Sequence, residues 1–222
     1  MKQRPSLTMP ASWNGNATHL WYLLIVPVYL ASFFIIEQII DRDSNYWVSY
    51  LPLDDLIPFC EWFVIPYVLW YPFLASVGVY ALLREPDVFK KYMTFIGVGF
   101  MSSIAVFALF PNGQDLRPAV MERDNVATQL MQAIYAADTN TNVLPSMHAV
   151  GSIGVACGVF HCKGLKNPLW KIGAAAMAFL IICATVFTKQ HSILDVFAAI
   201  PYAAVVYVVS FHLLHRKKGK TV

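Results

Sequence analysis

The chain has 222 residues, of which 58% are hydrophobic and 13% are charged. A soluble domain carries roughly 25% charged residues, and the apolar runs in this sequence are too long for the core helices of a soluble protein. The formal net charge is +3, and no stretch of the sequence has the clustered basic residues of a nucleic-acid-binding patch. These features exclude a soluble domain, and the runs lack the strict alternation of membrane-barrel strands.

Six apolar segments predict an all-α, polytopic membrane helix bundle that forms a single membrane domain over residues 1–222. The expected spans, in chain order, are 20–40, 56–83, 92–110, 145–162, 169–187 and 191–214. The polar residues 1–19 are too many for the n-region of a signal peptide, so we expect the first span to be retained. A polar stretch at 111–144 is long enough to hold a short amphipathic helix near 124–137.

Lysine and arginine predict the orientation, because cytoplasmic loops retain them. One side of the predicted bundle carries twelve of these residues, namely Lys2, Arg4, Arg84, Lys90, Lys91, Lys163, Lys166, Lys171, Arg216, Lys217, Lys218 and Lys220. The other side carries four, namely Arg42, Arg117, Arg123 and Lys189. The distribution predicts an integral protein of the bacterial plasma membrane with both termini in the cytoplasm. The polar motifs then lie at the outer membrane surface.

The segment 188–195, Thr-Lys-Gln-His-Ser-Ile-Leu-Asp, holds a histidine and an aspartate four residues apart. With Thr188 as the N-cap of a helix, His191 and Asp195 share one face. An aspartate bonded to one imidazole nitrogen leaves the other nitrogen as a nucleophile or base, and a helix N-terminus disfavours the imidazolium form. A satisfied pair within the bundle is the alternative, but ionisable pairs inside membranes are costly and usually functional.

Two further segments on the predicted outer side contain residues suited to phosphate chemistry. Pro145 suits the first position of a helix, which would leave the Ser146 hydroxyl and first-turn N–H groups facing an anion, with His148 as a proton donor. Arg117 and Lys189 can bind phosphate, the first in bidentate fashion and the second as a point charge. Each of these residues alone also fits a structural or surface role.

Together, Arg117-Pro118, Pro145-Ser146-Met147-His148 and His191-x3-Asp195 resemble the type 2 phosphatidic acid phosphatase superfamily. That family's signature reads Lys-x6-Arg-Pro, Pro-Ser-x-His and Ser-Arg-x5-His-x3-Asp, and the match covers about residues 110–195. The resemblance implies that His191 is the nucleophile, that Asp195 orients it and that His148 is the general acid. It further implies that Arg117, Ser146 and the first-turn backbone hold the phosphoryl oxygens.

Two cations of that signature are missing here. Phe110 stands at the lysine of the first motif, and Ala184 and Thr185 stand at the Ser-Arg of the third. Lys189 is expected to replace part of the lost charge. This abbreviated third motif is similar to the branch that contains inositol phosphorylceramide and sphingomyelin synthases, which pass a phosphoryl headgroup to another alcohol.

The resulting expectation is a metal-independent, cofactor-free lipid phosphatase whose partners are the membrane and a lipid phosphate. Phosphatidic acid, phosphatidylglycerophosphate, undecaprenyl diphosphate and lipid A or sphingoid phosphates all remain candidate substrates, and the oligomeric state stays open. Headgroup transfer to an alcohol is one alternative. An anion channel or transporter is another, although an anion site has no need of a carboxylate-oriented imidazole.

Residues outside the motifs receive structural predictions. We expect Cys60, Cys157, Cys162 and Cys183 to pack as small apolar side chains, since no CxxC spacing appears. Asp54 and Asp55 would repel a phosphate, so a cap or a loop tie is expected there. Glu37 and Glu61 should pair with polar groups of the bundle. No carboxylate–histidine cluster has the spacing of a metal site.

Overall fold

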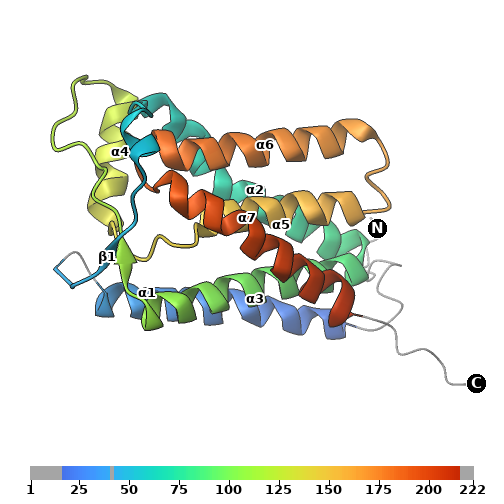
Figure 1. Ribbon diagram of the computed structural model, residues 1–222. Helices are drawn as coiled ribbons and strands as arrows, with labels where there is room; N and C mark the ends of the chain where they lie inside the picture. The colour runs from blue at the N-terminus through green and yellow to red at the C-terminus, as the bar shows by residue number, and fades with distance from the viewer. Residues whose placement is uncertain (1–16, 41–42, 216–222) are drawn as a thin grey trace, which may run out of the picture.

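The computed structural model describes residues 17–40 and 43–215, and this part of the chain is mostly helical (Figure 1). Six long helices run side by side, and α4 (Val126–Ala137) lies at one end of them. The long helices are α1 (Ile25–Ile39), α2 (Val64–Arg84), α3 (Pro86–Leu109), α5 (Met147–His161), α6 (Pro168–Phe187) and α7 (Ile193–Tyr207). Short helical turns extend three of them, at Thr18–Leu24 before α1, at Glu61–Phe63 before α2 and at Val208–Leu213 after α7.

Five helical stretches are long and apolar enough to cross a membrane. They are Thr18–Ile39, Glu61–Arg84, Pro86–Leu109, Pro168–Phe187 and Ile193–Leu213. Large apolar side chains cover their outer surfaces; Phe34, Leu109 and Phe179, for example, are 66%, 86% and 70% exposed. Soluble proteins rarely leave such continuous apolar surface in water. The predicted membrane helix bundle is therefore confirmed at this level.

Helix α5 is shorter than each of these five stretches and is largely enclosed by other helices. Its 15 residues rise about 22 Å, whereas a span needs about 20 residues. It packs against α2, α3, α6 and α7. A Cβ atom on Gly154 would lie 2.6 Å from a ring carbon of Phe95, so a small residue is needed for this close packing. Most of α5 thus faces protein and contributes little surface to lipid.

Two predicted span boundaries are displaced. The second span begins at Glu61, because residues 56–60 belong to the preceding loop. The third begins at Pro86, only two residues after α2 ends at Arg84. Proline suits the first turn of a helix, and the helix therefore starts earlier than its apolar run. Lys90 and Lys91 consequently lie on α3 and not in a loop.

The end of the bundle that carries α4 also holds a small parallel sheet, which the all-α prediction missed. Strand β1 (Trp47–Val48) pairs with β2 (Asn112–Gly113), and Gly113 also bridges to Thr141. A Cβ atom on Gly113 would lie 2.6 Å from the ring of Tyr46, so the segments approach this closely only at a glycine. The sheet joins three loops that are far apart in sequence.

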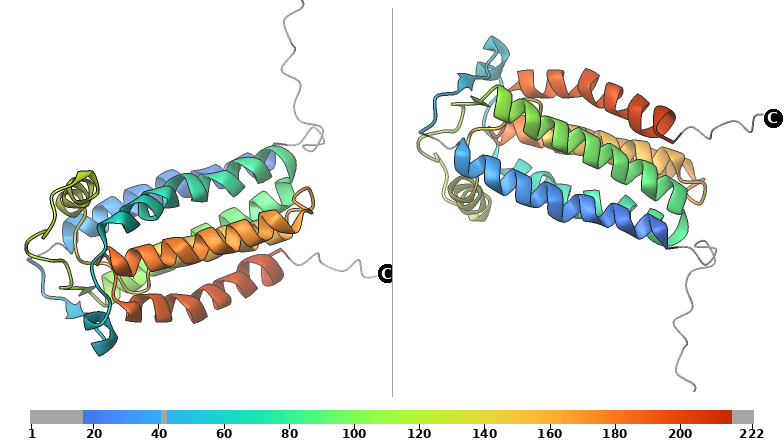
Figure 2. Two further views of the ribbon diagram at one scale, coloured as in Figure 1. Left: turned by 90° about the horizontal axis from the view of Figure 1, so that it is seen from above. Right: turned by 90° about the horizontal axis from the view of Figure 1, so that it is seen from below.

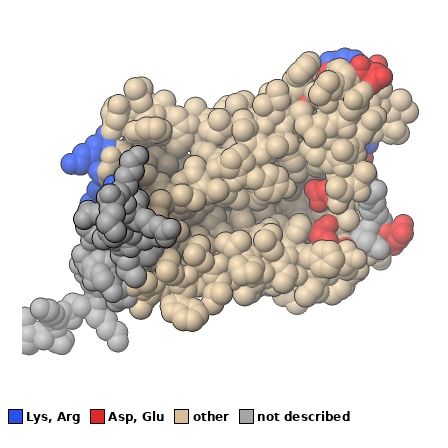
Figure 3. Space-filling view, turned by 180° about the vertical axis from the view of Figure 1, so that it is seen from behind, with Lys and Arg blue, Asp and Glu red and all other residues tan. Residues whose placement is uncertain are grey.

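The described chain begins and ends at the opposite end of the bundle. There the rings of Tyr22 and His215 lie 6.4 Å apart, and in both views of Figure 2 the start of the coloured ribbon before α1 and its end after α7 lie away from α4. On the face shown in Figure 3, acidic side chains gather at one end and most of the basic ones at the other. The basic residues at 2, 4, 42, 216, 217, 218 and 220 lie outside the described residues.

Candidate active site

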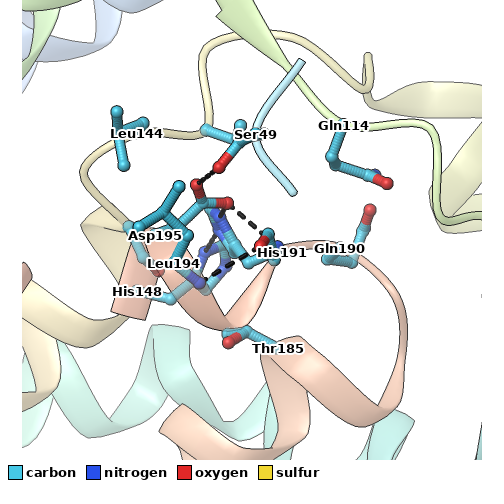
Figure 4. Close-up of polar contacts among 12 residues, drawn as sticks. Ser49, Gln114, Leu144, His148, Thr185, Gln190, His191, Leu194 and Asp195 are labelled. Atoms are coloured by element: carbon cyan, nitrogen blue, oxygen red, sulfur yellow. Dashed lines mark hydrogen bonds and ion pairs between the residues drawn. The ribbon is translucent and has the colours of Figure 1, made fainter. Parts of the chain in front are cut away.

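His148, His191 and Asp195, the three residues predicted to be catalytic, lie together at the α4 end of the bundle (Figure 4). Nδ1 of His191 is 3.2 Å from Oδ2 of Asp195, and its Nε2 is 3.4 Å from Nδ1 of His148. Asp195 is fully buried and His191 is 6% exposed. A carboxylate at Nδ1 favours the tautomer that leaves a lone pair on Nε2. The arrangement suits a nucleophilic or basic imidazole.

The N-cap of α7 is Ser192 and not Thr188 as predicted. The Ser192 hydroxyl accepts a hydrogen bond from the N–H of Leu194 at 3.1 Å, and the Asp195 carboxylate accepts one from the N–H of Ser192 at 3.0 Å. Thr188 instead ends α6, where its hydroxyl donates to a carbonyl of the last turn. His191 therefore precedes the helix, and the argument that placed it in the first helical turn is wrong.

A tight turn between α6 and α7 positions His191. Lys189 adopts a positive φ of 51°, which reverses the chain after α6. The N–H groups of Gln190 and His191 then donate to the carbonyl of Thr185 at 2.9 and 3.1 Å. Two hydrogen bonds to one acceptor fix the backbone immediately before the imidazole. Thr185 thus contributes its carbonyl oxygen at a position where the family signature has a side-chain cation.

The segment between α1 and α2 supports the Asp195–His191 pair from behind. The Ser49 hydroxyl donates to Oδ1 of Asp195. The Asp54 carboxylate accepts from the Ser192 hydroxyl at 2.6 Å and from the Ile193 N–H at 2.8 Å. Asp54 therefore caps α7, which confirms the predicted cap or loop tie. Ser49 is a lone serine in a loop, and no sequence pattern singles it out.

His148 lies in the first turn of α5, between the nucleophile candidate and aromatic rings of α2. Its ring centroid is 4.4 Å from that of Trp70 and 4.7 Å from that of Tyr67. Its Nε2 atom has no hydrogen-bond partner among the described residues. His148 therefore has one nitrogen facing His191 and a second that is buried without a hydrogen bond.

The start of α5 differs from the prediction, which placed Pro145 at the first helical position. The helix begins at Met147, and Ser146 is the N-cap, its hydroxyl accepting from the N–H of Ala149 at 3.3 Å. The N–H of Ser146 donates to the carbonyl of Asp195 at 3.2 Å. This bond joins the starts of α5 and α7, and it occupies an N–H that we expected to face an anion.

Arg117 contacts Gln190, the residue that precedes His191 in the chain. Its guanidinium donates to the side-chain oxygen of Gln190 at 2.6 Å and lies 4.6 Å above the ring of Tyr135. It also donates to the backbone carbonyls of Tyr135, Asp138 and Thr139. Arg117 thus holds the loop after α4 against the turn that carries His191. Its phosphate-binding role remains a prediction.

Lys189 is buried, and its ammonium nitrogen donates to the carbonyls of Asp54 and Ile57 at 2.8 and 2.6 Å. Burial lowers the pKa of the Lys189 ammonium below its ordinary value, and the charges of Asp54 and Asp55 offset only part of that effect. In this structure the lysine ties the 54–57 loop to the α6–α7 turn. Binding phosphate would require exchange of at least one carbonyl.

Sequence reasoning missed two amides beside the histidines. Gln190 donates to the Tyr67 hydroxyl at 3.2 Å and accepts from Arg117. Gln114 is fully buried, and its amide nitrogen has no hydrogen-bond partner among the described residues. The two side chains point toward each other in Figure 4. The only signal for Gln190 was its place next to His191, and Gln114 carried none.

Other predicted structural roles are met by contacts around the site. Glu37 accepts hydrogen bonds from Thr139 and Asn142, and Glu61 pairs with Arg123 at 3.0 Å, as expected of these two acids. The four cysteines are free thiols. Among residues 17–40 and 43–215, no group of three or more His, Cys, Asp or Glu side chains is arranged to hold a metal ion.

A large apolar cavity begins at His148. It has a volume of about 640 Å³ and lies between α1 and α2, with α3 as its floor. Figure 3 views the face on which α1 and α2 lie, and the surface is hollowed between them. Tyr67 and Asp138 line the cavity near His148, and Leu82 and Phe89 line its far end. Of the two histidines, His148 lines this apolar space and His191 lies behind it.

Fold and site together define an apolar helix bundle with a buried histidine–carboxylate pair at one end and a cavity leading to it. No protein-family model, curated protein or solved structure matches the chain.

Proposed function

We propose that the protein is a membrane phosphatase of the type 2 phosphatidic acid phosphatase superfamily that hydrolyses a lipid phosphate through a phosphohistidine at His191. The position of His148 carries the proposal. One of its ring nitrogens lies 3.4 Å from Nε2 of His191, and the same residue lines the apolar cavity. A phosphate ester with its hydrocarbon in the cavity would present its ester oxygen to His148 and its phosphorus to His191.

In the first chemical step, the Nε2 lone pair of His191 forms a bond to phosphorus as the bond from phosphorus to the lipid oxygen breaks. His148 gives its proton to the departing oxygen, so the lipid leaves as a neutral alcohol. Asp195 stabilises the positive charge that develops on the His191 ring. Reacting atoms approach to about 3–3.5 Å, a space that the His148 ring now occupies. Substrate binding must therefore move one imidazole aside.

In the second step, water replaces the lipid alcohol and attacks the phosphorus of phosphohistidine. His148, now neutral, takes a proton from that water, and the bond from nitrogen to phosphorus breaks to release inorganic phosphate and restore both histidines. An alcohol in place of water would make the enzyme a headgroup transferase. The same geometry serves both reactions, and the acceptor distinguishes them.

We further propose that the chain crosses the membrane six times and that the active site faces the extracytoplasmic side. Helix α5 would complete the sixth crossing from within the bundle. Six described basic residues lie toward the end where the chain begins and ends, namely Arg84, Lys90, Lys91, Lys163, Lys166 and Lys171. At the site end, Arg117 and Lys189 donate to backbone carbonyls and Arg123 pairs with Glu61. Basic residues favour the cytoplasmic side, which would place the site outside.

The test is an incubation of purified protein, in vesicles, with a panel of lipid phosphates, with and without an added polyol. We expect free inorganic phosphate and the dephosphorylated lipid, with no product from His191→Ala. A phosphorylated polyol would identify a transferase. Failure to convert any lipid phosphate, by either route, would contradict the proposal.

A further inference from the structure

The side-chain amide of Gln114 is fully buried at the site end of the bundle and has an unused hydrogen-bond donor. Its Oε1 accepts from the N–H of Leu116 at 2.6 Å, which fixes the orientation of the amide because only the oxygen can accept. Within residues 17–40 and 43–215, no atom accepts a hydrogen bond from the Nε2 at its other end. A buried donor without a partner is destabilising, so its presence indicates a ligand-binding role.

The hydrogen bonds around Gln114 determine where this donor points. The N–H of Gln114 donates to the carbonyl of Asn140 at 2.8 Å, and the Asn140 side-chain amide donates to the Gln114 carbonyl at 2.8 Å. Together with the bond from Leu116, these contacts hold both the main chain and the side chain of Gln114. A ligand could therefore accept from Nε2 without the entropic cost of ordering a long side chain.

Two routes place this donor beside the buried histidine–carboxylate pair. Gly113, the residue before Gln114, accepts from the N–H of Ser49 at 2.7 Å, and the Ser49 hydroxyl donates to Asp195. On the second route, the side chain of Gln114 points toward that of Gln190, the residue that precedes the nucleophile candidate (Figure 4). The amide is thus connected to the site from the carboxylate side and from the turn that carries the imidazole.

The two basic side chains nearest to the histidines are already engaged. Arg117 donates to three backbone carbonyls and Lys189 donates to two. Phe110 and Thr185 stand where the family signature has further cations. Gln114 lies four residues after Phe110 and three before Arg117, so it belongs to the segment that supplies the first motif of the signature. It adds a donor to this segment without adding a charge.

We propose that Nε2 of Gln114 donates a hydrogen bond to a non-bridging phosphoryl oxygen of the substrate, as an uncharged replacement for a missing cation. The inference rests on the proposed phosphatase function and adds a phosphoryl ligand that the signature lacks. Hydrogen bonds to a charged oxygen are stronger than those between neutral groups. The phosphoryl group stays next to His191 in both chemical steps, so one fixed donor can contact it throughout.

The test uses the full-length protein in phosphatidylcholine vesicles with the lipid phosphate of the panel above that is hydrolysed fastest. Inorganic phosphate and orthovanadate are inhibitors that contain the phosphoryl part alone, and the dephosphorylated lipid is an inhibitor that lacks it. Gln114→Met has a similar length and no donor. Gln114→Glu keeps an oxygen for the N–H of Leu116 and replaces the donor by a charge, so it carries the comparison if the Met variant does not fold. Gln132→Met, exposed on α4 at the same end, is the matched control.

We expect the inhibition constants of phosphate and orthovanadate to rise about 10- to 100-fold in Gln114→Met, the range of one hydrogen bond to a charged group. The kcat/KM for the lipid phosphate should fall over the same range. Gln114→Glu should lose more, because its carboxylate repels the anion. Inhibition by the dephosphorylated lipid should stay within about twofold, and Gln132→Met should match the wild type. Orthovanadate should also raise the unfolding temperature of the wild type more than that of Gln114→Met.

Three results would overturn the inference and leave the phosphatase intact. Unchanged constants in Gln114→Met would mean that the donor meets only water or Gln190. Equal weakening of phosphate and of the dephosphorylated lipid would show that Gln114 only supports the fold. Weaker inhibition by phosphate with unchanged kcat/KM would place the amide at a site for free phosphate, away from the reacting group. A wild type that hydrolyses none of the lipid phosphates would instead refute the proposed function itself.

Discussion

Ser49 offers a quantitative test of how the site is supported. Its hydroxyl donates to Oδ1 of Asp195, and both residues are fully buried, so no solvent can replace the bond in Ser49→Ala. A hydrogen bond to a charged group contributes about 1.5–3 kcal/mol. If that energy holds Asp195 in the orientation that positions His191, the rate should fall by about 10- to 100-fold.

The assay measures kcat and KM on a lipid phosphate together with the thermal unfolding of the protein. We expect kcat to fall and KM to stay within about twofold, because Ser49 contacts the carboxylate and lies behind the imidazole. Ser49→Thr keeps a hydroxyl and should restore most of the activity. Ser76→Ala serves as a control, because Ser76 is exposed on α2 and its hydroxyl donates to the carbonyl of Phe73. A lower unfolding temperature with unchanged kcat would show that Ser49 only stabilises the fold and would refute the reasoning.

Three further predictions concern the acid, the packing of α5 and the topology. His148→Ala should slow hydrolysis of an alkyl phosphate by about 10²–10⁴-fold but barely affect p-nitrophenyl phosphate, whose leaving group needs no proton; equal losses would show that His148 is not the acid. Gly154→Ala should lower the free energy of unfolding by about 1–3 kcal/mol, because its Cβ would lie 2.6 Å from Phe95, whereas Gly173→Ala, with open space around it, should not. In a cysteine-free background, Glu122→Cys should react with an impermeant thiol reagent in intact cells and Lys166→Cys should not; the reverse pattern would invert the topology.

The helices could be predicted from the sequence because apolar runs determine them. The polar end could not, because its structure depends on contacts between distant segments. The pairing of Trp47–Val48 with Asn112–Gly113 is too short to leave a period in the sequence. Helix α3 begins at Pro86, several residues before the apolar run by which its span was predicted.

The candidate active site divides in the same way, into local contacts that the sequence predicts and distant contacts that it does not. The contact between His191 and Asp195 could be predicted because their spacing is local, and it forms at 3.2 Å although the helix begins only at Ile193. Ser49 reaches Asp195 across 146 positions of sequence, and nothing near Ser49 indicates this contact. The buried ammonium of Lys189 was assigned to phosphate because its loop carbonyl partners cannot be read from composition.

The central claim is that His191 carries the phosphoryl group, and the most direct measurement is to trap it. The protein is mixed with a radiolabelled lipid phosphate, and the reaction is stopped in base, in which a phosphohistidine survives. The labelled peptide is then mapped by mass spectrometry. The account predicts phosphate on His191 of the wild type, more of it when hydrolysis is slowed, and none in His191→Ala. Label on another residue, or rapid turnover by His191→Ala, would contradict the account.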